Sequence, residues 1–308
     1  MGAIPQQSGI PGTPSGVWTG SSRLIDRIER VDLRVRDIEA ALHFYRDAVG
    51  FDVVAREQAY AALAPPGGSV ILTLDSAGVT APAVRRATGL FHTAIRFPDR
   101  ASLGDALARL ANAGLEVGGG DHAVSEALYV DDPAGNGVEL YRDRPRADWP
   151  EPVPGARIPM TTGRVDFDGL LAAGRGLDAV GEPAPAATDI GHVHFRVSDH
   201  KATRAFYEGV LGLDLVADLG SAGFFSSGGY HHHVGANTWE SLGAPPAPAS
   251  SAGLERVVFA VGSRAELDTL RSRLESAAGR MQGSFESEQD RLVVRDPDGI
   301  ELRFEHHA

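Results

Sequence analysis

Apolar and polar residues alternate in short segments along this chain, most clearly in the segment that starts at Asp189. Between residues 193 and 197, valine and phenylalanine alternate with histidine and arginine, a period of two that predicts a strand. His192 stands at the start of this alternation, so its side chain projects from a rigid strand, as suits a metal ligand. A lone histidine on a strand is more often a packed or solvated residue, so its role depends on its companions.

Strands and a helix follow one another in a fixed order in the first part of the chain. Alternating apolar residues from Ile28 to Val35 predict a strand, and Asp37 is placed to cap a helix. Apolar residues then recur at helical spacing up to Val49, and Gly50 predicts the helix end. Three short apolar runs follow at residues 51–56, 59–63 and 70–74. The pattern predicts a βαβββ unit.

This unit recurs along the chain. The second copy starts with a strand at residues 88–97 and a helix at 103–114. Two closing strands follow at 127–130 and 138–141, joined by an Asp-Pro-Ala-Gly turn at 132–135. Residues 35–51 match residues 197–213 without a gap, and a second Asp-Pro-x-Gly turn begins at Asp296. A capping box from Ser263 to Glu266 opens the helix expected at 263–278. We predict an α+β fold of four tandem βαβββ modules.

The modules group into two domains with curved mixed sheets. We expect the first domain at 24–146, with modules 24–85 and 86–146, and the second at 188–308, with modules 188–245 and 250–308. Proline punctuates residues 147–187, which predicts a linker with one helical turn at 167–173. Residues 1–23 are rich in Gly, Pro and Ser, and we expect a disordered tail there.

Composition narrows the possible functions. The chain has 308 residues, a formal net charge of −12 and no cysteine. A nucleic acid or an anionic membrane would require a basic face, so a small-molecule substrate is the better expectation. Without thiolates, any metal must be held by histidine and carboxylate. No apolar run is long enough to span a bilayer or to form a signal core, so we expect a cytoplasmic protein.

The repeated motifs carry a family resemblance. An aspartate opens a helix that ends in Phe-Tyr, a Val-Gly-Phe or Leu-Gly-Leu stretch follows, and an Asp-Pro-x-Gly turn comes later with a glutamate on the next strand. From about residue 26 to 305 the chain thereby resembles the vicinal oxygen chelate superfamily of glyoxalases, bleomycin-resistance proteins and extradiol dioxygenases. The stretches 89–92, 121–129, 136–145 and 228–239 resemble tandem two-domain catechol 2,3-dioxygenase-like proteins.

The resemblance implies a metal held between two modules by a histidine from each first strand and a glutamate from one last strand. The first-strand positions are Arg30, His92, His192 and Arg256, and the last-strand acids are Glu139 and Glu301. Pairing in chain order completes no triad. Pairing of module two with module three collects His92, Glu139 and His192, a facial triad suited to Fe(II), with Mn, Ni or Zn as alternatives. Modules one and four would then form a site in which arginine pairs with Glu301.

Further residues are implied as catalytic. On a strand His231 and His233 would share one face, and we expect this pair, rather than His232, to face the site. Three consecutive histidines are also typical of an incidental surface metal binder. Tyr129 lies ten positions before Glu139, where extradiol dioxygenases carry an active-site tyrosine, and His122 lies close to the position of a second histidine.

Three functions remain open at this point. The first is a metal-dependent extradiol dioxygenase that cleaves a catechol-like aromatic with O₂. The second is a glyoxalase- or epimerase-like metal enzyme, which would need a fourth protein ligand. The third is a metal-free protein that binds an aromatic or antibiotic ligand. The substrate, the native metal and the oligomeric state are not determined by the sequence.

Overall fold

The structure, a computed structural model, describes residues 20–154, 156–178 and 181–307. Most of the tail expected to be disordered, residues 1–19, lies outside the described residues. At its end, the backbone N–H groups of Ser21 and Ser22 donate to the Asp214 carboxylate at 2.7 and 2.8 Å. The described chain therefore starts against the third module.

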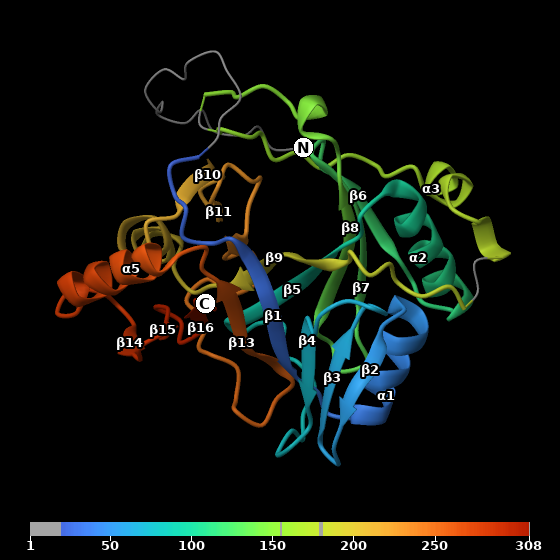
Figure 1. Cartoon of the computed structure of the whole chain (residues 1–308), viewed down its shortest axis with the longest axis horizontal. Coiled ribbons are helices and arrows are strands. Elements are labelled where there is room, and N and C mark those ends of the chain that lie inside the picture. Colours follow the sequence, from blue (N-terminus) through green and yellow to red (C-terminus); the bar gives the residue numbers. More distant parts are fainter. Residues whose placement is uncertain (1–19, 155, 179–180, 308) are drawn as a thin grey trace.

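The first two modules have the predicted order of elements (Figure 1). Module one contains β1 (Arg27–Arg34), α1 (Ile38–His43), the π-helix η1 (Phe44–Val49), β2 (Asp52–Arg56), β3 (Tyr60–Ala64) and β4 (Leu72–Asp75). Module two contains β5 (Gly89–Arg96), α2 (Arg100–Asn112), β6 (Gly118–Asp121), β7 (Ser125–Asp131) and β8 (Gly137–Asp143). The apolar pattern does not predict β6, because its three glycines have no side chains that could alternate; β6 forms by pairing with β7.

The second half of the chain repeats this order. Module three contains β9 (Asp189–Arg196), α4 (His200–Arg204), the π-helix η4 (Ala205–Val210), β10 (Asp214–Asp218), β11 (Ala222–Ser226) and β12 (Val234–Asn237). Module four contains β13 (Gly253–Ala260), α5 (Arg264–Ala277), β14 (Ser284–Ser287), β15 (Arg291–Arg295) and β16 (Glu301–Glu305). Between the halves lie the 3₁₀ turns η2 (Arg146–Asp148) and η3 (Gly176–Asp178) and the predicted helical turn, confirmed as α3 (Phe167–Ala173).

Local signals set the helix ends as expected. The Asp37 carboxylate accepts the backbone N–H groups of Glu39 and Ala40, each at 3.0 Å, and so caps α1. Gly50 ends η1 with φ of 97°, a left-handed conformation that favours glycine. In α5 the Ser263 hydroxyl accepts the N–H of Glu266 at 3.3 Å. These contacts explain why the helix boundaries could be predicted from single residues.

The strand order shows which modules meet. It runs β14-β15-β16-β13-β1-β9-β5-β8-β7-β6. The antiparallel pairing of β5 with β9 joins module two to module three, and that of β1 with β13 joins module one to module four. The two halves of the sheet meet where Ile28 of β1 pairs with Ile190 of β9. The module pairing favoured by the ligand positions is therefore confirmed.

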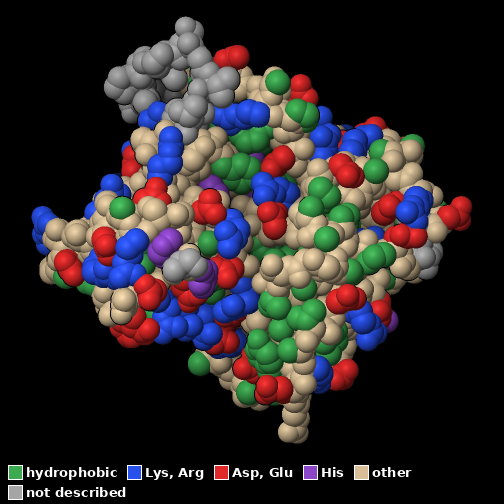
Figure 2. All heavy atoms as spheres, viewed as in Figure 1, with side chains coloured by type: hydrophobic (Ala, Val, Ile, Leu, Met, Phe, Trp, Pro, Cys, Tyr) green, Lys and Arg blue, Asp and Glu red, His purple; other side chains and the backbone are tan. Residues whose placement is uncertain are grey.

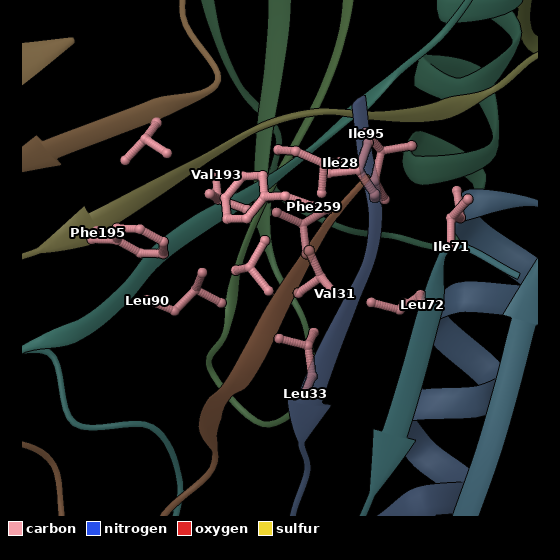
Figure 3. Packing of buried hydrophobic residues seen from close by; sticks show 14 of the residues in the cluster. Ile28, Val31, Leu33, Ile71, Leu72, Leu90, Ile95, Val193, Phe195 and Phe259 are labelled. Carbon is pink, nitrogen blue, oxygen red and sulfur yellow. The ribbon is translucent and has the colours of Figure 1, made fainter. Parts of the chain in front are cut away.

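The core lies along these four central strands. Figure 3 shows Ile28 and Val31 near Phe259, with Leu90 and Phe195 further along the same layer. All five side chains are buried, with exposed fractions of 3% or less. A packed apolar layer of this kind fixes the relative positions of the strands, and therefore of the polar side chains that those strands present.

The repeated motifs contact one another. Tyr45 of η1 donates its hydroxyl to Asp132 of the first Asp-Pro-x-Gly turn at 3.2 Å, and Tyr207 donates to Asp296 of the second at 3.0 Å. Both tyrosines are buried. Module one is thus tied to module two, and module three to module four, on the helical side of the molecule.

Candidate metal centre

Two bulges orient the histidines of the facing strands. Phe91 on β5 and Gly191 on β9 are extra residues in the β5–β9 ladder, and each directly precedes a histidine. A side chain at position 191 would overlap the hydroxyl of Tyr141, so any residue larger than glycine would force the strand or Tyr141 to shift. The side chains of His92 and His192 therefore project from the same side of the sheet.

His92, His192 and Glu139 meet at one point. Nε2 of His92 lies 3.0 Å from Oε2 of Glu139, and Nε2 of His192 lies 3.2 Å from the same oxygen. One ligand atom from each of the three residues lies within 4.8 Å of the other two. All three side chains are buried. The structure thus brings together the three residues that were expected to hold a metal.

The spacing of these atoms fits a divalent metal. Ligands at right angles around an ion with bonds of about 2.1 Å lie about 3.0 Å apart, close to both nitrogen–oxygen distances. Nε2 of His92 is buried and makes no hydrogen bond to a described residue, although it lies 3.0 Å from the carboxylate. A buried nitrogen without a hydrogen-bond partner is costly, and coordination would satisfy it.

The protonation states also suit a metal. Burial lowers the pKa of His192 to about 4, despite the opposing effect of Glu139, so its imidazole is neutral at pH 7. Burial by itself would raise the pKa of Glu139, but His192 and His92 outweigh it and hold this pKa well below the usual range. A neutral imidazole beside a buried carboxylate anion offers lone pairs and one negative charge to a cation.

The equivalent site of modules one and four has no such ligands. By strand register, the positions of His192, His92 and Glu139 are occupied by Arg30, Arg256 and Arg303. The expectation that Glu301 corresponds to Glu139 is wrong by two residues. Both Asp-Pro-x-Gly turns close with a hydrogen bond from the aspartate N–H to the carbonyl four residues later, and counting from this bond matches Glu139 with Arg303.

These arginines form ion pairs. Arg256 contacts Glu301 at 3.2 Å, as expected, and Arg303 contacts the same carboxylate at 2.9 Å. Arg30 pairs instead with Asp32, at 2.6 Å. Figure 2 shows basic side chains gathered over β13 and β16 with acidic side chains among them. A guanidinium stays protonated and cannot ligate a metal, so charge pairing replaces coordination here.

His122 and Tyr129 form a pair beside the triad. Nε2 of His122 lies 2.7 Å from the Tyr129 hydroxyl, and Nδ1 lies 2.7 Å from the carbonyl oxygen of Thr161. A carbonyl can only accept, so Nδ1 carries a proton and, in the neutral ring, Nε2 accepts the tyrosine proton. The Tyr129 ring lies 5.7 Å from that of His92. Burial and the nearby Glu139 raise the pKa of Tyr129 well above its usual value, which keeps the phenol neutral.

The three consecutive histidines are arranged differently from the expectation. β11 ends at Ser226 and β12 begins at Val234, so residues 231–233 lie in a bend and do not alternate as on a strand. His232 lies against His192, with 4.1 Å between ring centroids, and His231 lies 5.8 Å from it. Nδ1 of His233 accepts the N–H of Ser227 at 3.2 Å, away from the triad. His231 and His232, rather than His231 and His233, are therefore the neighbours of His192.

Sequence reasoning also missed His194. Its ring lies 5.0 Å from that of His92, and Nε2 lies 3.0 Å from the side-chain nitrogen of Asn237. Burial, with His92 and His192 nearby, lowers the pKa of His194 well below its usual value. The two-residue spacing from His192 on one strand could have identified it.

A cavity adjoins the triad. It has a volume of about 660 Å³ and is lined in part by Phe91, His92, Tyr129, Val138 and Arg196. This volume suits a small aromatic molecule. A larger hollow of about 810 Å³ lies between η4 and α5, but neither histidine nor carboxylate lines it. The chemistry therefore favours the smaller cavity as a substrate site.

The fold and this site define a class of proteins. Residues 27–140 and 189–304 match the model of the Glyoxalase/Bleomycin resistance protein/Dioxygenase superfamily, and the chain belongs to that superfamily. It is 43% identical over 269 residues to the catechol-2,3-dioxygenase of Bacillus subtilis. This match covers 86% of this chain and 92% of the relative.

Solved structures agree on the fold. Glyoxalase I from Zea mays matches 91% of this chain and 92% of its own, with a TM-score of 0.54 and 15% identity. The cppA protein of Streptococcus pneumoniae matches 93% of this chain and 100% of its own, with a TM-score of 0.53 and 12% identity. Among the described residues, no helix has the length and apolar character required to cross a membrane.

Proposed function

We propose that the protein is a metal-dependent extradiol dioxygenase that opens the ring of a catechol-like aromatic beside its two hydroxyl groups. The convergence of His92, Glu139 and His192 on one point carries this proposal. The high identity to a protein named catechol-2,3-dioxygenase supports the reaction type. The fold alone would not, because related folds support different chemistries.

His92, Glu139 and His192 would hold the ion, and Fe(II) is the metal that this donor set favours for reaction with O₂. A bound Fe(II) would polarise the diol oxygens and supply the redox chemistry for O₂. The buried walls of the site exclude water, which protects reactive species from hydrolysis. Phe91 and Val138 supply apolar surface for an aromatic ring in the adjoining cavity.

The remaining polar residues handle protons. An extradiol reaction begins with loss of a proton from the diol, which requires a base within reach. His231 and His232 lie beside His192 and are the candidates for this base. On the other side, the Tyr129 hydroxyl donates its one proton to His122; by rotating away from His122, the same O–H can donate to a bound oxygen and stabilise negative charge there. We assign His233 no role in the reaction because of its position.

The other functions predict different observations. A glyoxalase- or epimerase-like enzyme would use a fourth protein ligand, often a carboxylate, but Glu139 is the one carboxylate in the metal-ligand groups found among the described residues. Its reaction would also continue without O₂. A metal-free binding protein would contain no stoichiometric metal after purification.

The test begins with metal-depleted protein loaded anaerobically with Fe(II), Mn(II), Ni(II) or Zn(II). We expect about one equivalent of metal per chain, and O₂ uptake with a yellow product when catechols are added to the Fe(II) form. His192→Ala should lose the metal, whereas Arg30→Ala, at the equivalent position of the other site, should keep it. Full metal content in His192→Ala, or no product with a panel of catechols, would contradict the proposal.

A further inference from the structure

A carboxylate beyond the triad holds one of the neighbouring histidines. Asp143 lies four residues after Glu139 on β8, so the two side chains point to the same face of the strand. Its Oδ1 lies 2.9 Å from Nε2 of His231. Its Oδ2 accepts the hydroxyl of Tyr230 at 2.8 Å and a guanidinium N–H of Arg96 at 3.2 Å. Both carboxylate oxygens are thus occupied by different partners.

These partners keep Asp143 ionised. Burial would raise the pKa of Asp143, but His231, Arg96 and Tyr230 outweigh this effect and hold it below the usual range. An ionised carboxylate has no proton to donate. The hydrogen bond to His231 therefore requires a proton on Nε2 of that ring.

The position of the proton on His231 determines which nitrogen of His232 is protonated. Nδ1 of His231 lies 2.9 Å from Nδ1 of His232, so one of these nitrogens must donate to the other. In its neutral form, His231 carries its one proton on Nε2, and its Nδ1 can only accept. Nδ1 of His232 is then the donor. Nε2 of His232 is left with a lone pair.

The nitrogen that carries this lone pair is buried. Nε2 of His232 has no hydrogen-bond partner among the described residues. The His232 ring lies 4.1 Å from that of His192, beside the proposed metal ligands. A buried nitrogen with a lone pair beside His192 can accept a proton from a diol held by the proposed metal ligands.

We propose that Asp143 is a positioning residue that fixes the tautomers of His231 and His232 in series, so that Nε2 of His232 presents its lone pair to the diol site. The catalytic part of this inference rests on the proposed function. In that reaction the O–H bond of a diol hydroxyl breaks, the proton moves to Nε2 of His232, and the electron pair stays on the oxygen. His232, rather than His231 or His233, is the residue that accepts the proton.

The tautomers can be measured in the metal-free protein by ¹⁵N NMR of labelled histidine. In the unsubstituted protein we expect His231 protonated at Nε2 and His232 at Nδ1. In Asp143→Asn, Tyr230 and Arg96 retain the amide oxygen as acceptor, so the amide NH₂ faces His231 and donates to it. Both tautomers should then reverse, which places a proton on Nε2 of His232.

Asp189→Asn is the matched control. Asp189 also binds Arg96, at 2.6 and 2.9 Å, but among the described residues it forms no hydrogen bond or ion pair with His231 or His232. We expect its spectrum to keep the original tautomers. Unchanged tautomers in Asp143→Asn, or the same reversal in Asp189→Asn, would overturn the proposed positioning.

Activity supplies a second readout. In the Fe(II)-loaded enzyme, Asp143→Asn should lower kcat by about 10²- to 10⁴-fold, the range typical for loss of a proton-transfer group, with KM and metal content within about twofold. An unchanged kcat together with reversed tautomers would overturn the catalytic part. An inactive unsubstituted enzyme would contradict the proposed function instead, and the tautomer measurement would still decide the role of Asp143.

Discussion

Gly191 shows how much a single position contributes to the site. It is the bulge residue before His192, and a Cβ at this position would overlap the hydroxyl of Tyr141, which is fully buried. The ring of Tyr141 lies 4.9 Å from that of His192. The orientation of His192, a proposed metal ligand, thus depends on the absence of a side chain at the preceding position.

Gly191→Ala should therefore lower the free energy of unfolding by about 1–3 kcal/mol and weaken metal binding, because the strand or Tyr141 must move. Gly209→Ala is the matched control, since a Cβ there meets no atom within 4 Å. It should be neutral or should stabilise by about 0.5–1 kcal/mol, because alanine favours a helix over glycine. Urea unfolding and metal titration measure both effects, and equal stability of the two variants would contradict this account.

Asp296, also a single residue, makes the stability of the fold depend on pH. Burial raises its pKa to about 7, from an ordinary value of 3.8. Between about pH 4 and pH 7 the folded state therefore keeps a proton that the unfolded state has lost, and this group makes stability fall as pH rises. In Asp296→Asn that contribution is absent. Unfolding measured from pH 4 to pH 7.5 should show a smaller loss of stability in the variant than in the unsubstituted protein, and parallel curves would contradict the expectation.

At the scale of elements, a buried arginine joins the helical side of the first half. Arg109 of α2 donates to the carbonyl of Val49 at 2.8 Å, to that of Ala48 at 3.3 Å and to that of Glu182 at 2.9 Å. The carbonyls of Ala48 and Val49 lie at the end of η1, where helix geometry leaves them without backbone partners. The carbonyl of Glu182 lies in the linker. Arg273 of α5 occupies the equivalent place in the second half and donates to Leu211 at 3.0 Å from an exposed position.

Arg109→Ala should cost about 2–4 kcal/mol of unfolding free energy, because buried carbonyls lose their donors and the side chain leaves a cavity. Arg273→Ala should cost less than about 1 kcal/mol, since water can replace its hydrogen bond. Denaturant unfolding of the pair tests this difference. A larger effect at Arg273 would show that solvent access does not decide the cost.

At the scale of the whole molecule, one of two equivalent sites carries the proposed metal ligands. The triple variant Arg30→His, Arg256→His and Arg303→Glu places the ligand types of the first site in the second. If strand register determines the metal site, this variant should bind about two equivalents of divalent metal per chain instead of one. Elemental analysis after desalting measures the ratio. A well-folded triple variant that still binds one equivalent would show that the surrounding residues, and not register alone, form the site.

The sequence by itself determined the elements and their repetition, because each depends on local signals. Asp37 and Ser263 cap their helices through bonds to residues two or three positions away, and alternation identified β9. The ligand types also follow from sequence, since only two first-strand positions carry histidine. The pairing of modules two and three could be inferred from those residues, although the linker permitted either arrangement.

Only the tertiary structure decided what depends on contacts between distant segments. The bend at residues 231–233 turns His232 toward His192, and no local pattern encodes this direction. Asp143 meets His231 although 88 residues separate them in the chain. Glu301 resembles Glu139 in residue type, but the pairing of β16 with β13 sets the strand register and places Arg303 at the position equivalent to Glu139. Hydrogen-bond partners and register are properties of the assembled sheet, and for this reason the proton arrangement of the site required the fold.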